Sequence, residues 1–216
     1  MSYKVGVLRF PGTNCDRDIE QAVNACEGTP EYLWHLDQFD YKKYSALVIP
    51  GGFSYGDYLR CGALASRSPV MKSVIEAANK GTPILGICNG FQILCESGLL
   101  PGALVKNDKL RFIDQWVGLK LSNTNPYFAK GLSAGHNARL PIAHGEGRFY
   151  ADTETLKKIE DNGQVWWTYE QTPNGSMKNI AGIMNDNKNV AALMPHPERA
   201  IFEWMGSEDG RNFFEN

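Results

Sequence analysis

A cysteine set between two glycines constrains this chain most, because it lies where an apolar strand gives way to a helix. The stretch from Pro83 to Leu94 reads PILGICNGFQIL, so Gly86 and Gly90 stand two residues before and after Cys88. This is the spacing of a nucleophile elbow, a tight and strained turn in which only residues without side chains leave room for neighbouring backbone. Such a turn would aim Cys88 into solvent at the N-terminus of a helix, where the macrodipole favours a thiolate. Cys88 is therefore a candidate nucleophile, although a free cysteine is more often a small buried hydrophobe.

The bulk composition is that of an ordinary soluble protein. A chain of 216 residues is long enough for one large domain with a substantial core. The hydrophobic fraction of 43%, the charged fraction of 21% and the net charge of -2 show no basic excess that would attract a polyanion such as nucleic acid. No repeat or linker interrupts the sequence, so we expect a single domain over residues 1–216.

The cysteines predict reduced thiols. Their number is odd and no two of them form a C-x-x-C pair, so their pattern resembles neither a disulfide framework nor a zinc site. We therefore expect no metal site. The N-terminus runs into a strand without the apolar region of a signal peptide, and no apolar run reaches the ~20 residues of a membrane span. We therefore expect a cytosolic protein without membrane association. The five cysteines are Cys15, Cys26, Cys61, Cys88 and Cys95.

Short apolar runs alternate with helical patterns in the first half of the chain. Strands are expected over residues 4–10, 32–36, 46–50 and 84–87, and helices over residues 16–27, 69–80 and directly after Cys88. Ser68 is the expected cap of the second helix, with Pro69 in its first turn and Gly81 after its end. This alternation predicts an α/β fold with a mainly parallel sheet covered on both faces.

The second half is richer in strands. They are expected over residues 112–121, 139–143, 164–169, 180–184 and 190–194. The turn sequence DNKN at residues 186–189 indicates a hairpin between the last two of these strands. We therefore expect additional antiparallel strands beside the parallel sheet.

His196 is the histidine best placed to serve a thiol nucleophile, which usually needs a base that is itself oriented by an acceptor. It follows the expected strand over residues 190–194 in the sequence PHPE, which ends at Glu198. The two prolines fix the backbone and hold both side chains at the carboxyl end of a strand, where open α/β sheets bind ligands. A triad of Cys88, His196 and Glu198 is therefore expected. His144 also follows a strand and is the alternative base.

A glycine pair follows another expected strand, in the sequence PGGFSYGD that begins at Pro50. Its backbone N–H groups could point at a developing oxyanion, with the N–H of Asn89 as a second donor. A flexible turn would use the same glycines. The loop is not a nucleotide-binding fingerprint, because neither G-x-G-x-x-G nor G-x-x-x-x-G-K-[ST] occurs.

The segments GICNGFQ and HPE, which hold the three expected triad residues, resemble the triad class of glutamine amidotransferases. Four longer segments narrow the resemblance to the small glutaminase subunits of phosphoribosylformylglycinamidine synthase, an enzyme of purine biosynthesis. These segments are RFPGTNCD at residues 9–16, PGGFSYGDYLRCGA at 50–63, IAHGEGRF at 142–149 and MPHPERA at 194–200. The resemblance implies a flavodoxin-like three-layer sandwich forming one amidotransferase domain.

The resemblance also implies a role for each matching residue. Cys88 would attack the glutamine side-chain amide to form a γ-glutamyl thioester, His196 would move the protons, and Glu198 would hold the imidazole. The other implied site residues are the oxyanion donors Gly52, Phe53 and Asn89 and the substrate contacts Gln92, His144, Gly145 and Glu146.

The expected partners follow from the same resemblance. Amination of formylglycinamide ribonucleotide needs ATP, and this chain has no phosphate-cradling motif. A larger synthetase subunit would therefore supply ATP and magnesium, with a small bridging subunit in the same complex, while this chain binds glutamine and no cofactor. Two alternatives remain: a free-standing cysteine hydrolase, such as a peptidase or γ-glutamyl hydrolase, and a regulatory subunit without activity.

Overall fold

The computed structural model describes residues 3–215 of the chain. Nine of the strands among these residues form one sheet, and two form a separate pair. In chain order the strands are β1 (Lys4–Arg9), β2 (Thr29–Trp34), β3 (Ala46–Ile49), β4 (Ile84–Ile87), β5 (Ala103–Val105), β6 (Ile113–Leu121), β7 (Asn137–His144), β8 (Arg148–Tyr150), β9 (Val165–Tyr169), β10 (Ile180–Met184) and β11 (Val190–Leu193). The α-helices are α1 (Asp16–Ala25), α2 (Val70–Asn79), α3 (Asn89–Glu96) and α4 (Thr153–Asp161). Strands β5 and β8 form a separate antiparallel pair.

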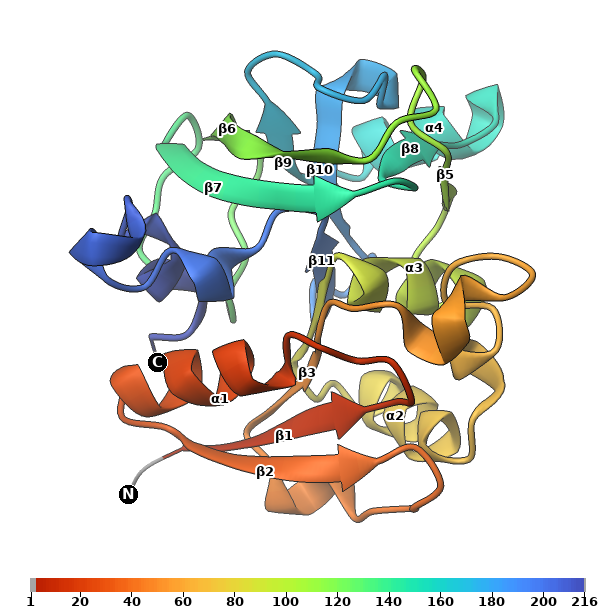
Figure 1. Ribbon diagram of the computed structural model, residues 1–216, viewed down its shortest axis with the longest axis vertical. Coiled ribbons are helices and arrows are strands. Elements are labelled where there is room, and N and C mark those ends of the chain that lie inside the picture. The colour runs from red at the N-terminus through yellow and green to blue at the C-terminus, as the bar shows by residue number, and fades with distance from the viewer. Residues whose placement is uncertain (1–2, 216) are drawn as a thin grey trace.

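The strand order is β2-β1-β3-β4-β11-β10-β9-β6-β7. The first five strands pair in parallel, and every pair from β11 to β7 is antiparallel. Figure 1 shows the parallel strands β1, β2 and β3 in the lower half of the molecule and the antiparallel strands β6, β7, β9 and β10 in the upper half. The expected mainly parallel sheet with added antiparallel strands is therefore confirmed.

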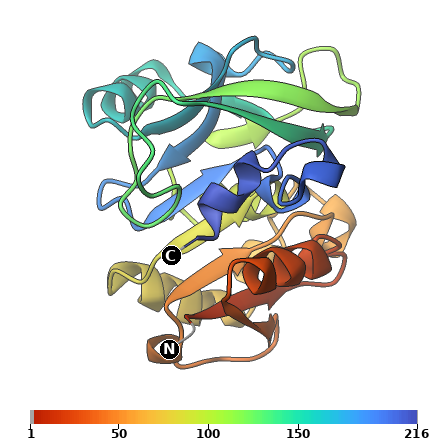
Figure 2. The ribbon, with the colours of Figure 1, turned by 90° about the vertical axis from the view of Figure 1, so that its left-hand side faces the viewer.

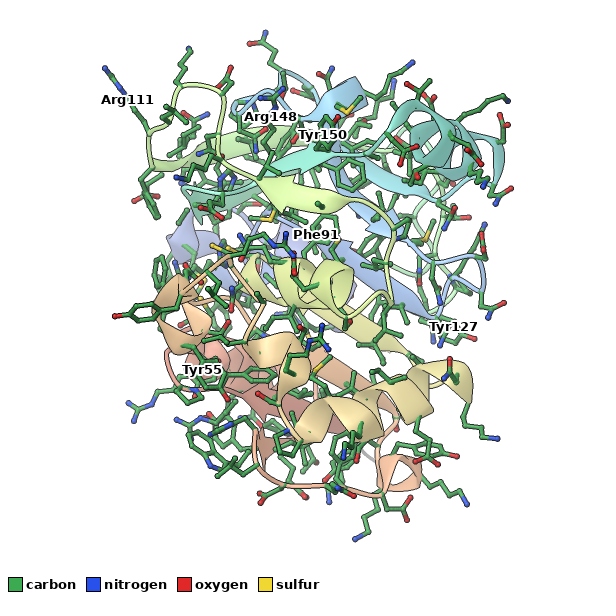
Figure 3. All side chains as sticks on the ribbon, turned by 90° about the vertical axis from the view of Figure 1, so that its right-hand side faces the viewer. Tyr55, Phe91, Arg111, Tyr127, Arg148 and Tyr150 are labelled. Carbon is green, nitrogen blue, oxygen red and sulfur yellow. The ribbon has the colours of Figure 1, made fainter. Side chains whose placement is uncertain are left out.

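Helices cover both faces of the parallel part. Helix α1 and the C-terminal segment lie in front of the sheet in Figure 2. Helices α2 and α3 lie on the opposite face, which Figure 3 shows with Phe91 of α3 labelled. This is the arrangement that right-handed crossovers produce when the strand order reverses beside β1.

Burial explains the sequence patterns of the strands. All four residues of β4 are buried, because the strand is covered on both faces, and its sequence ILGI is accordingly apolar throughout. Strand β7 alternates between exposed or half-buried and buried residues, as an antiparallel edge strand with one solvated face does.

Several elements differ from the sequence-based expectations. Strand β2 begins at Thr29 rather than residue 32, and β5, β8 and α4 had no predicted counterpart. Helix α4 is short, and its start is marked by the side chain of Asp152, which accepts a hydrogen bond from the N–H of Thr155 at 2.9 Å. Ser68 does not cap α2; its hydroxyl instead lies 2.8 Å from the hydroxyl of Tyr55.

The parallel strands β1, β3, β4 and β11 end at one edge of the sheet. The loops after them carry Cys15, Gly52, Cys88 and His196, in that order of strands. The loops after β1 and β3 also pair through an isolated bridge between Thr13 and Gly52. This edge is where open α/β sheets bind ligands, at the point where the strand order reverses.

Candidate active site

Cys88 occupies the strained turn that the two glycines predicted. Its backbone has φ 51° and ψ -106°, a conformation that residues with a side chain rarely adopt. A side chain at Gly90 would overlap the carbonyl oxygen of Ile49, and a Cβ at Gly86 would lie 2.9 Å from the backbone of Gly90. Both glycines are therefore required for the elbow to pack between β3 and α3.

The thiol of Cys88 faces a cavity, so the expectation that it points into open solvent is wrong. Cys88 is 6% exposed, and its Sγ lies 3.9 Å from the carbonyl oxygen of Ala143 at the end of β7. The antiparallel half of the sheet thus covers the elbow. A cavity of about 240 Å³ remains over the thiol, lined by Asn14, Cys15, Gly52, Phe53, Cys88, Phe112, Asp114, Ala143, His196 and Arg199.

His196 and Glu198 form a buried pair beside this cavity. The Nδ1 atom of His196 lies 2.6 Å from Oε1 of Glu198, and the two residues are 2% and 1% exposed. The backbone N–H of His196 donates to the carbonyl oxygen of Pro141 at 2.8 Å, which fixes the loop after β11 against β7. Among the described residues, Nε2 of His196 has no hydrogen-bond partner, so this nitrogen remains available to exchange a proton.

The charges around His196 favour its protonated form. Burial alone would lower the pKa of the imidazole, but the carboxylate of Glu198 and the nearby thiol of Cys88 raise it well above its ordinary value. This opposition of burial and charge is typical of a histidine that stabilises an imidazolium during catalysis. The structure thus places the His196–Glu198 pair beside the cavity that holds the thiol of Cys88. That the three residues act as a triad stays a prediction.

The expected oxyanion donors differ in their present bonding. Gly52 has φ 145°, and a Cβ there would lie 2.7 Å from the carbonyl oxygen of Gly12, so the loops after β1 and β3 touch at this residue. The N–H of Phe53 donates to that same carbonyl at 2.9 Å and is not directed at the elbow. The N–H of Asn89 lies in the first turn of α3, where no intrahelical acceptor exists.

The side chain of Gln92 links the elbow helix to the loop after β7. Its Nε2 donates to the carbonyl oxygen of Glu146 at 2.6 Å, and its Oε1 accepts from the side chain of Asn89 at 2.8 Å. Asn89 in turn accepts the N–H of Ser54 at 3.2 Å. This chain of hydrogen bonds holds the loop after β3 and the loop after β7 on either side of α3. Whether Gln92, Gly145 and Glu146 contact substrate stays a prediction.

His144 is held away from the cavity. Its Nδ1 lies 3.2 Å from Oδ1 of Asn107, and the side chain of Asn107 also donates to the carbonyl oxygen of His144 at 2.9 Å. Burial, with a smaller contribution from the charge of His196, lowers the pKa of His144 to about 4. His144 is absent from the described lining of the cavity, which favours His196 as the base.

Comparison with known proteins identifies the family. The sequence matches the CobB/CobQ-like glutamine amidotransferase domain over residues 2–213. The chain belongs to this family. The elbow and the His196–Glu198 pair are therefore features of an amidotransferase domain.

Two relatives and two solved structures show how far the similarity extends. A protein of Chlorobaculum tepidum named phosphoribosylformylglycinamidine synthase subunit PurQ is 51% identical over 222 residues, covering 98% of this chain and 94% of the relative. The relative of that name from Nostoc sp. is 53% identical over 214 residues, covering 98% and 95%. A chain of PurLQS from Thermotoga maritima superposes with a TM-score of 0.89 at 42% identity, covering 98% of this chain and 95% of that one. A glutamine amidotransferase from the same organism shares the fold, with a TM-score of 0.59 at 20% identity over 93% and 78% of the two chains.

Sequence reasoning missed several residues that line this cavity. Asn14, Cys15, Asp114 and Arg199 line the cavity beside Cys88 but had received no role. Asn14 and Cys15 follow β1, and a rule that ligands gather at the carboxyl ends of parallel strands would have singled them out. Asp114 comes from β6, a strand far along the chain, and no local signal pointed to it.

Among residues 3–215, none of the helices is both long enough and apolar enough to cross a membrane.

Proposed function

We propose that this chain is the glutaminase subunit of phosphoribosylformylglycinamidine synthase. It hydrolyses glutamine to glutamate and ammonia and passes the ammonia to a synthetase. The synthetase uses it for ATP-dependent conversion of formylglycinamide ribonucleotide to formylglycinamidine ribonucleotide in de novo purine biosynthesis. The observation that carries this proposal is the strained Cys88 in a cavity beside the buried His196–Glu198 pair, in a chain whose relatives carry that enzyme's name over nearly their full length.

The first half of the reaction releases ammonia. The Sγ of Cys88 gives its proton to Nε2 of His196 and attacks the side-chain carbonyl carbon of glutamine, forming a tetrahedral oxyanion. As the oxyanion collapses, the C–N bond breaks and His196 returns the proton to the leaving nitrogen. Ammonia departs and a γ-glutamyl thioester remains on Cys88.

The second half regenerates the thiol. A water molecule gives a proton to His196 and its oxygen attacks the thioester carbon. The C–S bond then breaks, glutamate leaves, and the sulfur recovers the proton. Glu198 holds the imidazole in the orientation and tautomer that both halves require, because its Oε1 lies 2.6 Å from Nδ1 of His196.

The surrounding backbone serves the oxyanion and the substrate. We assign the N–H groups of Gly52 and Asn89 to the oxyanion, together with the N–H of Phe53 once it is released from the carbonyl oxygen of Gly12. The substrate's α-amino and α-carboxylate end lies toward Gln92 and the loop that carries His144, Gly145 and Glu146. Support comes from the hydrogen bond that joins Gln92 to the carbonyl oxygen of Glu146 and so places this loop beside the elbow helix.

The ATP-dependent step belongs to a partner. We assign ATP and magnesium to a larger synthetase subunit, with a small bridging subunit in the same complex, and no cofactor to this chain. The similarity to a chain of the solved PurLQS structure supports association with other subunits. The cysteines are all unpaired, which suits a reducing compartment such as the cytosol.

A glutaminase assay of this chain, alone and with the synthetase subunits, tests the proposal. We expect slow glutamine hydrolysis by the chain alone and a steep rise on assembly with ATP and the ribonucleotide. Rapid hydrolysis of peptides or γ-glutamyl conjugates without a partner would instead identify a free-standing hydrolase. A complex that uses only added ammonium would identify a regulatory subunit.

A further inference from the structure

A second cysteine lies against the catalytic pair and lines the same cavity as Cys88. Cys15 is 2% exposed, between β1 and α1, and its Sγ lies 3.9 Å from Nδ1 of His196. That same nitrogen is 2.6 Å from Oε1 of Glu198. The sulfur, the nitrogen and a carboxylate oxygen all lie within 4.8 Å of one another. Cys15 has no role in the proposed steps of glutamine hydrolysis.

The carboxylate of Glu198 offers a free ligand atom at this point. Glu198 is 1% exposed, and its Oε2 has no hydrogen-bond partner among the described residues. A buried carboxylate oxygen that accepts no hydrogen bond destabilises the fold, because it has lost its hydrogen bonds to water and formed none within the protein. A cation among these three side chains would remove that cost.

We propose that Cys15, His196 and Glu198 form an inhibitory Zn²⁺ site within the glutaminase centre, an inference that rests on the proposed function for its effect but not for the binding itself. Thiolate, imidazole and carboxylate are the three ligand types that zinc takes in proteins, and three protein ligands leave a fourth position for water. The fourth position faces the cavity that Cys15 and His196 both line, which also gives the ion its entry path.

The distances suit a tetrahedral ion after a small adjustment. In a tetrahedral site, zinc bonds of about 2.0 Å to nitrogen and oxygen and about 2.3 Å to sulfur separate a nitrogen and an oxygen ligand by roughly 3.3 Å and a sulfur and a nitrogen ligand by roughly 3.5 Å. Cys15 and His196 are already near that spacing at 3.9 Å, while the 2.6 Å hydrogen bond between His196 and Glu198 would have to open.

Arg199 supplies support outside the ligands. Its Nη2 donates to Sγ of Cys15 at 3.3 Å, and its Nε pairs with Asp18 at 3.1 Å. A hydrogen bond from a positioned donor fixes the direction of the sulfur, as outer partners of metal ligands commonly do. The thiolate and the carboxylate together balance the charge of the ion.

Zinc and catalysis exclude one another here because both use Nδ1 of His196. During hydrolysis Nδ1 carries a proton toward Glu198 and Nε2 accepts the proton of Cys88. Zinc replaces the Nδ1 proton and the thiol proton of Cys15, and the neutral imidazole then carries its one proton on Nε2. Nε2 can no longer accept a proton, so Cys88 loses its base. Magnesium, which prefers oxygen ligands, does not compete for this set.

Cobalt absorption tests the binding without reference to activity. Co²⁺ replaces zinc in such sites and shows a thiolate-to-cobalt charge-transfer band. We expect this band in the full-length wild-type chain, with bleaching by added zinc, and equally in Cys88→Ala. Cys15→Ser and Cys15→Ala should lose it, while Cys26→Ser, which alters another buried cysteine, should keep it. Absence of the band in the wild type, or its loss in Cys88→Ala with retention in both Cys15 variants, would overturn the proposal.

Zinc inhibition of the assembled synthase tests the consequence. Each variant is compared with its own zinc-free glutaminase rate, and chelation should restore that rate. Loss of a residue that only hydrogen-bonds a metal ligand already weakens metal binding about 10- to 100-fold. Because Cys15→Ser removes a ligand itself, it should raise the zinc concentration needed for inhibition by at least about that factor. Equal zinc sensitivity of wild type and Cys15→Ser would overturn the inhibitory role. If the chain shows no glutaminase activity, the proposed function fails, yet the cobalt spectra still decide whether the site exists.

Discussion

The backbone N–H of Phe53 donates to the carbonyl oxygen of Gly12 at 2.9 Å, and this bond ties the loop after β3 to the loop after β1. An N–H that is held this way cannot also donate to an oxyanion on Cys88. Rotation of the peptide between Gly52 and Phe53 would be needed first. Gly52, with φ 145°, is the residue type that permits such a change, because it carries no side chain.

The loop that follows Phe53 exposes two large apolar side chains. Tyr58 is 74% exposed and Leu59 is 89% exposed, which suits contact with a partner. Two other residues of the loop have local roles instead. The hydroxyl of Tyr55 lies 2.6 Å from Nδ1 of His35, and Arg60 pairs with Glu96 at 2.6 Å. The loop is thus anchored at Tyr55 and free to be bound at its tip.

We predict that partner binding raises kcat of the glutaminase more than it lowers KM. The partner would dock near residues 54–66 and release the Phe53 N–H toward the oxyanion, a contact made only in the transition state. One oxyanion donor is worth about 10²- to 10³-fold in kcat. Steady-state constants of the free and assembled protein decide this, and equal kcat values in the two states would refute it.

Replacing the nucleophile should separate the two reactions of the synthase. Cys88→Ala should abolish glutamine-dependent synthesis and spare synthesis from added ammonium, because the synthetase site needs only ammonia. Cys88→Ser should be nearly as damaging, since a hydroxyl is a far weaker nucleophile in this turn. Both activities are measured on the same assembled preparation, so that loss of both would indicate misfolding rather than loss of the thiol. Full glutamine-dependent activity in Cys88→Ala would exclude Cys88 as the nucleophile.

His196→Ala should be more damaging than Glu198→Ala. The first change removes the proton carrier, worth about 10²- to 10⁴-fold, whereas the second removes only the group that orients it. Glutaminase rates of the two variants in the assembled complex give the order. The reverse order would make His144 the better candidate for the base.

Local sequence was sufficient for the elbow and for the His196–Glu198 pair. Glycines around Cys88 and prolines around His196 restrict the backbone within a few residues, so their effect can be read from the chain itself. The alternation of apolar runs and helical patterns likewise predicted the parallel sheet.

Contacts between distant segments could not be predicted in this way. Cys15 meets His196 although 181 positions separate them, and Asn107 meets His144 across 37 positions. Nothing in the residue types around Phe53 indicates that its N–H points at Gly12 rather than at Cys88. Helix α4 was missed because its apolar face is narrow, with only Leu156 and Ile159 buried among its described residues.

Gly90→Ala should destabilise the fold. The added methyl group would overlap the carbonyl oxygen of Ile49 in β3, and neither backbone can move without disturbing the sheet. Overpacking of this kind costs about 1 to 3 kcal/mol or more. Gly145→Ala is the matched control, because the nearest atom to its Cβ is 3.8 Å away, and it should change the free energy of unfolding by no more than about 0.5 kcal/mol. Equal denaturant midpoints for the two variants would contradict the steric explanation.

The stability of the protein should depend on His144 in weakly acidic solution. Burial lowers the pKa of His144 from 6.5 to about 4 in the folded state, so the unfolded chain binds a proton first as the pH falls. Above about pH 6.5 the histidine is neutral in both states, so its burial does not lower the free energy of unfolding. As the pH falls toward 4, the unfolded chain is protonated first and the free energy of unfolding of the wild type decreases progressively. The shift corresponds to a loss on the order of 3 kcal/mol. His144→Gln keeps a side-chain donor for Asn107 but does not titrate, so its free energy of unfolding should fall less over this range. Urea unfolding of both proteins at several pH values measures the difference between them, which should shrink or change sign as the pH drops; parallel curves would show that His144 does not carry this dependence.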